Sequence, residues 1–234
     1  MRLNKYIIIS GLVLLSSAQI YAQGNANTML RAVYSKMMKA NDYSVQANIK
    51  VDMPFIRILP VEVKIYYKQK DKFKVESKSI AVVPRQGFDQ IPKLLADSNS
   101  FTSMVQGDEL VESIPTKLIN VIPLSDTGDL ILAKFWVDPK RSVIMKSQLT
   151  TRSSGTILTE YTYGSQVAYG LPDQMIFSVD VNKFKMPKGV ATEDANKNAS
   201  GKEEKGKDGK KGKIFVVLTN YQVNKGIPDS VFKK

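Results

Sequence analysis

The chain has 234 residues and a formal charge of +12, with 34 Lys and Arg against 22 Asp and Glu. It contains no cysteine and no histidine, which excludes disulfides, cysteine nucleophiles, thiolate or histidine metal sites and a Ser-His-Asp triad. A chain without cysteine also cannot carry an acylated N-terminal cysteine. The basic balance is compatible with a lipid surface, an acidic partner or simple solubility.

The first 22 residues are typical of a secretory signal. Arg2 and Lys5 supply the positive start, residues 6–15 supply the apolar centre, and small residues offer cleavage after Ala18 or Ala22. A transmembrane anchor would need roughly 20 apolar residues, which is longer than this stretch. We therefore expect a signal peptide over 1–22, cleaved near Ala22, and one exported domain over 23–234.

One helix and a run of strands are expected next. Residues 28–41 carry Leu30, Val33, Tyr34, Met37 and Met38 at the three- and four-residue spacing of an apolar helix face. Alternating apolar residues predict strands over 43–51, 61–69 and 72–77, the last two forming a hairpin. Between the first and second of these strands, residues 55–59 are expected to form an apolar loop or a short edge segment, bracketed by prolines.

The middle of the chain, 82–126, carries four prolines and the weakest pattern. Short helical turns are expected over 90–96 and 116–120, followed by a strand over 130–137. Three further strands, over 142–149, 157–163 and 175–181, are separated by short breaks rich in Gly, Pro, Asp and Ser. Such short connections indicate an antiparallel meander.

Residues 188–213 form a Lys-rich, low-complexity insert that has almost nothing to bury. We expect it to be a disordered loop between neighbouring strands, with the last strand over 214–223. Gly201 to Lys207 nearly matches a phosphate-binding loop, but Asp208 replaces the Ser or Thr and no strand precedes it. The adjacent Glu203 and Glu204 are expected to be solvated. The sequence therefore predicts no catalytic residue, no metal and no cofactor.

Four local patterns, in this order, carry a resemblance to a known family. They are Tyr67 to Val75, Trp136-Val137-Asp138-Pro139-Lys140, Tyr161-Thr162-Tyr163-Gly164 with Leu171 to Met175, and Ile227 to Phe232. Together they resemble LolA, the family of periplasmic carriers that take lipoproteins to the bacterial outer membrane. The resemblance spans about residues 28–232 and is poorest over 80–129.

The resemblance implies a mainly β (α+β) fold: an open antiparallel β-barrel or curved sheet with the N-terminal helix in its concave face. In this family an Arg of the second hairpin often holds the lid helices to the barrel. Gln69 occupies that place here, so the sequence does not carry over the arginine contact. The Lys-rich insert is a second departure from the simplest members.

A ligand space is expected between the helix and the sheet, where the apolar cavity of the family receives acyl chains. The proposed lining is Leu30, Val33, Met37, Met38, Ile65, Tyr67, Phe73, Val75, Phe135, Val137, Tyr161, Phe177 and Val179. Alternation places the strand residues on single faces but does not say which face is inside. The methionines either fill gaps in a core or line an adaptable ligand surface.

The expected function is a periplasmic carrier or chaperone that binds lipoprotein acyl chains and delivers them toward the outer membrane, without any covalent step. Its partners would be lipoprotein or other lipid, an inner-membrane donor and an outer-membrane acceptor, and not nucleic acid. A lipid-sensing regulatory domain that binds a membrane protein is the alternative. An enzyme is a third class, disfavoured by the absent histidine and cysteine.

Overall fold

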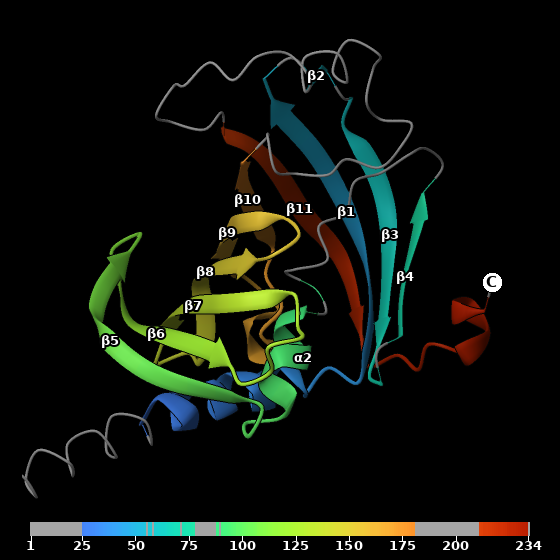
Figure 1. Ribbon diagram of the computed structural model, residues 1–234. Coiled ribbons are helices and arrows are strands. Elements are labelled where there is room, and N and C mark those ends of the chain that lie inside the picture. Colours follow the sequence, from blue (N-terminus) through green and yellow to red (C-terminus); the bar gives the residue numbers. More distant parts are fainter. Residues whose placement is uncertain are drawn as a thin grey trace, which may run out of the picture.

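The computed structural model describes residues 25–54, 56–57, 59–70, 72–77, 88, 90–180 and 211–233. Within these residues the strands form one antiparallel sheet, ordered β4-β3-β1-β11-β10-β9-β8-β7-β6-β5, with β2 paired only to β1. Figure 1 shows the sheet curving around α2, with the N-terminal helix (blue) at its lower end. The predicted fold class, a mainly antiparallel curved sheet with a helical cover, is confirmed.

The first strands match the predicted hairpin and its neighbour. Their bounds are β1 Asp42–Met53, β2 Ile56–Arg57, β3 Val61–Lys68 and β4 Lys72–Ser77. The later strands are β5 Phe101–Val111, β6 Ile114–Pro123, β7 Leu130–Asp138, β8 Val143–Thr151, β9 Gly155–Thr162, β10 Gln174–Asp180 and β11 Lys211–Val223. Short 3-10 turns lie at Val167–Tyr169 (η2), between β9 and β10, and at Asp229–Phe232 (η3), after β11. β11 begins three residues earlier than the predicted strand, so Lys211–Lys213 belong to the sheet.

The sheet is open, because its two edge strands, β4 and β5, lie at opposite ends of the strand order. Of the two expected forms, an open barrel or a curved sheet, the described strands form the curved open sheet, which is not closed into a barrel. Alternation decides which side is buried: in β1 every second residue from Tyr43 to Met53 is buried, and Val45 stands opposite buried Ile65 of β3. The same alternation continues through β11 and β10, where Val216 pairs with Met175.

Two helices cover the buried face. The N-terminal helix occupies residues 25–37, a few residues earlier than predicted, and buries Leu30 and Val33 in the same apolar cluster as the strand side chains. The helix α2 spans Gln90–Ala96, as predicted, and contributes Ile91 and Leu95 to that cluster. The hydrophobic core therefore lies between the helices and the curved sheet.

The structure contradicts the prediction for residues 101–123, which form the strands β5 and β6. A helical turn was expected over 116–120, but this segment belongs to β6, which pairs with β5 on one side and β7 on the other. Ile119 and Val121 face the core and are fully buried, so pairing on both sides outweighs the local helix signal of Pro115. The predicted signal peptide and most of the Lys-rich insert lie outside the described residues.

None of the helices among the described residues is long and apolar enough to cross a membrane.

Candidate functional site

The structure brings the predicted lining residues of the strands to one side of the sheet. Tyr67 stands opposite Phe73, and Ile65 opposite Val75, in the β3–β4 hairpin. In strands farther along the sheet, Phe177 and Val179 of β10, Tyr161 of β9, and Phe135 and Val137 of β7 are buried in the same core cluster. The helix residues Leu30 and Val33 pack against this face from the other layer. The face of the strands that carries these residues is therefore the inner face of the sheet.

Most of these side chains are close-packed. Ile65, Phe135 and Phe177 are each 0% exposed, and Val33 is 1% exposed. Phe73 and Val75, near the β4 edge, are partly buried against the same cluster. In the described form the space between helices and sheet is thus largely filled by protein atoms.

A small apolar pocket remains at one end of this layer, between the end of the N-terminal helix and the first residues of β1. Its volume is about 40 Å³, which is room for water molecules and far less than the roughly 300–1,000 Å³ of a typical ligand site. Three predicted residues line it: Met37, Met38 and Tyr67. An acyl chain would fit only if the helical cover moved away from the sheet.

The other lining residues were not proposed from the sequence: Tyr43, Phe88, Pro92, Gly170, Leu171, Pro172, Met175 and Tyr221. Two of them could have been predicted from the sequence, because Tyr43 pairs with Tyr67 and Met175 pairs with Tyr161, which places them on the same buried face of the sheet. Phe88 and the 170–172 loop carried none, because only the tertiary fold brings them to the pocket. Gly170 has a φ of 65° and would place a Cβ 3.4 Å from Met37 Cγ, so it allows the methionine to lie close.

The pocket wall is rich in aromatic rings. Tyr43 and Tyr67 stack with their ring centroids 5.0 Å apart, and Tyr221 lies 5.9 Å from Tyr43. The Tyr221 hydroxyl donates to the Pro172 carbonyl at 2.8 Å. Burial raises the pKa of Tyr221 well above its ordinary value, so this hydroxyl stays protonated and the wall uncharged.

Side chains of the sheet bind the carbonyl groups at the exit of the N-terminal helix. Gln69 Nε2 donates to the Met38 carbonyl at 2.8 Å and to the Ala40 carbonyl at 3.4 Å. Asn224 Nδ2 donates to the Lys39 carbonyl at 2.9 Å, and its Oδ1 accepts from the Asn41 N–H at 2.7 Å. These contacts satisfy the carbonyls of the turn that follows the helix after Met37. Gln69 thus joins the β3–β4 turn to the residues that follow the N-terminal helix, with neutral hydrogen bonds.

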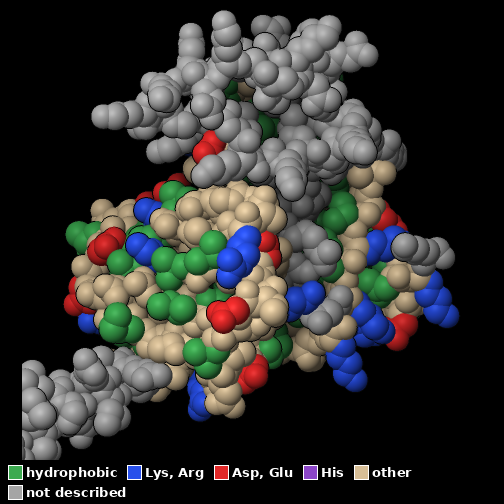
Figure 2. All heavy atoms as spheres, in the orientation of Figure 1, with side chains coloured by type: hydrophobic (Ala, Val, Ile, Leu, Met, Phe, Trp, Pro, Cys, Tyr) green, Lys and Arg blue, Asp and Glu red, His purple; other side chains and the backbone are tan. Residues whose placement is uncertain are grey.

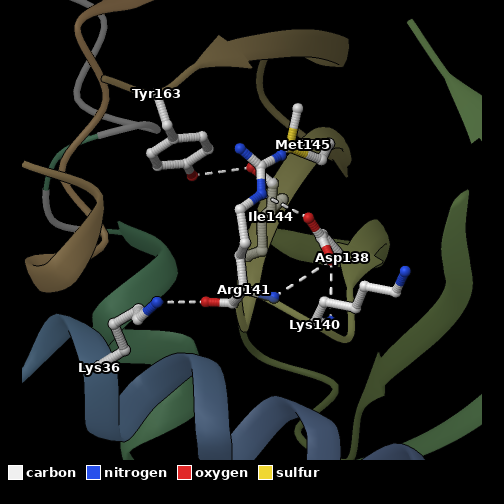
Figure 3. Close-up of polar contacts among 7 residues, drawn as sticks. All are labelled: Lys36, Asp138, Lys140, Arg141, Ile144, Met145 and Tyr163. Carbon is white, nitrogen blue, oxygen red and sulfur yellow. Dashed lines mark hydrogen bonds and ion pairs between the residues drawn. The ribbon is translucent and has the colours of Figure 1, made fainter. Parts of the chain in front are cut away.

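A second tie joins the helix to the turn between β7 and β8 (Figure 3). The Lys36 ammonium donates to the Arg141 carbonyl. Asp138, which is buried, organises this turn: it accepts from the Lys140 N–H at 2.9 Å and from Arg141 Nε at 2.5 Å. Burial alone would raise the pKa of Asp138, but the hydrogen bonds from Arg141 and Lys140 outweigh it and hold the pKa below its ordinary value. The Trp-Val-Asp-Pro pattern therefore reflects a turn that anchors the helical cover.

The Tyr161-Thr162-Tyr163 pattern supports the same region. Tyr163, drawn in Figure 3, donates its hydroxyl hydrogen to the Ile144 carbonyl at 2.8 Å. Tyr161 shares a hydrogen bond of 3.0 Å with Ser147 inside the core, and burial raises its pKa to about 12. Both tyrosine hydroxyls are therefore hydrogen-bonded within the fold.

A second, wider pocket of about 300 Å³ lies at the β5–β6 hairpin. Its lining mixes Asp108, Glu109 and Lys117 with Leu110 and two prolines. It contains none of the predicted lining residues and is separate from the apolar layer. No group of three or more side chains suited to hold a metal occurs in the described part of the chain.

The comparisons with known proteins concern the fold. A scan against protein-family models and a search of curated proteins gave no match. Among solved structures, a LolA superfamily protein from Nitrosomonas europaea is 10% identical with a TM-score of 0.54, covering 89% of this chain and 97% of its own. A domain from Vibrio parahaemolyticus, named for outer membrane lipoprotein sorting, is 7% identical with a TM-score of 0.57, covering 90% and 97%. The chain therefore has the LolA-like fold that its sequence patterns resemble.

Proposed function

We propose that the protein is an exported carrier that shields the acyl chains of lipids or lipoproteins between the helical cover and the concave face of its sheet. The observation that carries this proposal is one continuous apolar face, shared by strands from both ends of the sheet and closed by helices that polar side chains hold at their exit. The LolA-like fold is consistent with the same role.

The proposed mechanism is opening and closing of the cover. The pocket of about 40 Å³ is the seam at which separation begins, because there the core is least filled. Among the described residues, the polar side chains that oppose opening at this end include Gln69 and Asn224 after the helix and Lys36 at the β7–β8 turn. Acyl chains that replace the apolar contacts of the cover would compensate for opening at roughly 25 cal/mol per Å² of buried surface.

Release follows from the same balance. Because the empty form buries its own apolar face, the free energy gained by binding a lipid is reduced by the cost of opening. A partner that binds the lipid more tightly could then remove it without any covalent step. We propose delivery toward the outer membrane from an inner-membrane donor to an outer-membrane acceptor, in the periplasm.

The test is to identify what the protein carries when it is purified from its own exported fraction. Native mass spectrometry under gentle ionisation should find a population heavier by one lipid or lipoprotein. Delipidated protein should then take up an apolar dye with one-to-one stoichiometry. Protein that never carries lipid, binds no apolar dye, and instead forms a stable complex with one membrane protein would contradict the carrier and favour the regulatory alternative.

A further inference from the structure

Lysines surround the seam at which the pocket opens. Met37 and Met38 are followed directly by exposed Lys39, and Tyr67 is followed by the lysines of the β3–β4 turn. Figure 2 shows Lys and Arg side chains, with some Asp and Glu among them, along the right of the molecule, where Figure 1 draws β3 and β4. The lysines next to pocket-lining residues or in this turn are Lys36, Lys39, Lys68, Lys70, Lys72 and Lys93.

Two carboxylates at this end, Asp42 and Asp229, are occupied by contacts within the described part of the chain. Asp42 is buried and accepts from the backbone N–H groups of Lys225 and Gly226 at 3.1 Å. Asp229 is shared between Lys68 at 2.7 Å and Lys72 at 2.6 Å, which lowers the pKa of Asp229 to about 2. Two ammonium groups therefore share one carboxylate, and the excess of positive charge remains.

Lys39 and Lys70 are exposed, and no described carboxylate lies within ion-pair distance of either. Lys70 also has a φ of 67°, a left-handed conformation that glycine adopts more readily than lysine. A lysine thus occupies a turn position that favours glycine, at the rim of the seam. The two side chains offer strongly hydrated, mobile cations to a ligand there.

The charge is not spread evenly over the molecule. The β5–β6 hairpin and the loop that follows it, at the other side of the sheet, carry mostly acidic side chains: Asp108, Glu109, Glu112, Asp126 and Asp129. A basic rim around an apolar opening suits a ligand with an apolar tail and an anionic head.

We propose that the basic rim selects cargo whose head group is anionic: the acyl chain enters the seam at Met37, Met38 and Tyr67, and a phosphate-bearing head lies against Lys39 and Lys70. This rests on the proposed function, since it names the class of lipid taken by the same site. The shared chemistry is a phosphate, and a lipid head group is distinguished from free phosphate by the need for the chain.

The experiment uses delipidated full-length mature protein and fluorescent lipids with identical chains, labelled phosphatidylglycerol and labelled phosphatidylcholine, presented in vesicles. Protein is separated from vesicles and the lipid it retains is counted. The test variant is Lys39→Glu/Lys70→Glu. The matched control is Lys50→Glu/Lys213→Glu, which changes the net charge equally at two exposed lysines on the outer face of β1 and β11, near the opposite end of these strands. Circular dichroism checks that both variants are folded.

The wild type and the control should retain phosphatidylglycerol about five- to tenfold better than phosphatidylcholine, in a salt-dependent manner. The Lys39→Glu/Lys70→Glu variant should lose this preference while still retaining phosphatidylcholine. Inorganic phosphate in excess should compete only weakly.

Equal retention of both lipids by the wild type would overturn the head-group inference and leave the carrier intact. Retention of neither lipid would count against the carrier itself. Full displacement by inorganic phosphate, or sedimentation with vesicles without retained lipid, would also overturn the inference, since it would identify a phosphate site or a membrane-docking surface instead.

Discussion

Gln69 offers the sharpest single-residue test of the opening mechanism. Its side chain makes one good hydrogen bond, at 2.8 Å to the Met38 carbonyl, and one long one, at 3.4 Å to the Ala40 carbonyl. A neutral hydrogen bond contributes about 0.5–1.5 kcal/mol net, so Gln69→Ala should weaken the closed form by about 1 kcal/mol. That free energy corresponds to about a fivefold increase in the opening equilibrium constant.

The assay is the apparent affinity of delipidated protein for an apolar fluorescent dye. If the dye enters only the open form, Gln69→Ala should bind it about fivefold more tightly, since apparent affinity scales with the open fraction. Gln69→Arg should act in the opposite direction, because a charged donor makes a hydrogen bond roughly twice as strong with the same carbonyls. Gln148→Ala, on β8 and remote from the helix exit, is the matched control.

Global stability is followed in parallel by urea unfolding, with the fluorescence of Trp136, the single tryptophan of the chain. The Gln69→Ala variant should lose about 1 kcal/mol of unfolding free energy. A lower urea midpoint with unchanged dye affinity would refute the reasoning, because it would mean that Gln69 supports the fold without controlling access to the apolar layer.

Three further predictions address the core, the C-terminal contact and the insert. Phe177→Glu places an unpaired carboxylate at a fully buried position and should unfold the domain, as measured by circular dichroism. Met38→Glu at the pocket should instead keep the fold and abolish dye binding. A folded Phe177→Glu protein would contradict the close packing around Phe177. The pKa of Asp229 is lowered from 3.8 to about 2, so its pairing with Lys68 and Lys72 is fully favourable above about pH 3.8 and is lost as the pH falls toward 2. Hydrogen exchange at Val231 should therefore speed up through that pH range in the wild type but not in Asp229→Asn. Equal exchange profiles for the two proteins would refute the role of the ion pair. Replacing residues 188–210 by a short Gly-Ser loop should leave the melting temperature nearly unchanged, because their composition offers little to bury; a loss of more than about 5 °C, which for a domain of this size corresponds to more than 1 kcal/mol, would show that they pack on the fold.

The strands with clear alternation could be predicted from the sequence. In β3, β4 and β10 each apolar residue is followed by a polar or outward-facing one, and the observed bounds differ from those expected by at most one residue. The helix α2 was also predicted with its observed bounds. Local pattern suffices there because burial on one face dictates both the residue types and their period.

The β5–β6 hairpin could not be predicted in the same way. β5 is an edge strand, and most residues after Met104 are exposed, so burial imposes little pattern on its sequence. Pro115 and Pro123 further obscure β6. Pairing with β5 and β7 on its two sides makes β6 a strand, and the pairing with neighbouring strands is not visible in the local sequence.

Only part of the candidate site could be predicted from the sequence. Alternation placed Ile65, Phe135 and Phe177 on one face, but it could not show that they are closely packed while the pocket lies at the helix exit. Phe88 and Leu171 line the pocket although neither belongs to a strand whose alternation could place it there. The contact made by Gln69 likewise required the structure, since a glutamine in a hairpin predicts no particular partner.

The carrier proposal is tested most directly by native mass spectrometry of the mature protein purified from its own exported fraction. It predicts a mass increase that corresponds to one lipid or lipoprotein, removed by delipidation and restored by incubation with lipid. A protein that is ligand-free in that fraction, and that takes up no lipid after delipidation, would contradict it.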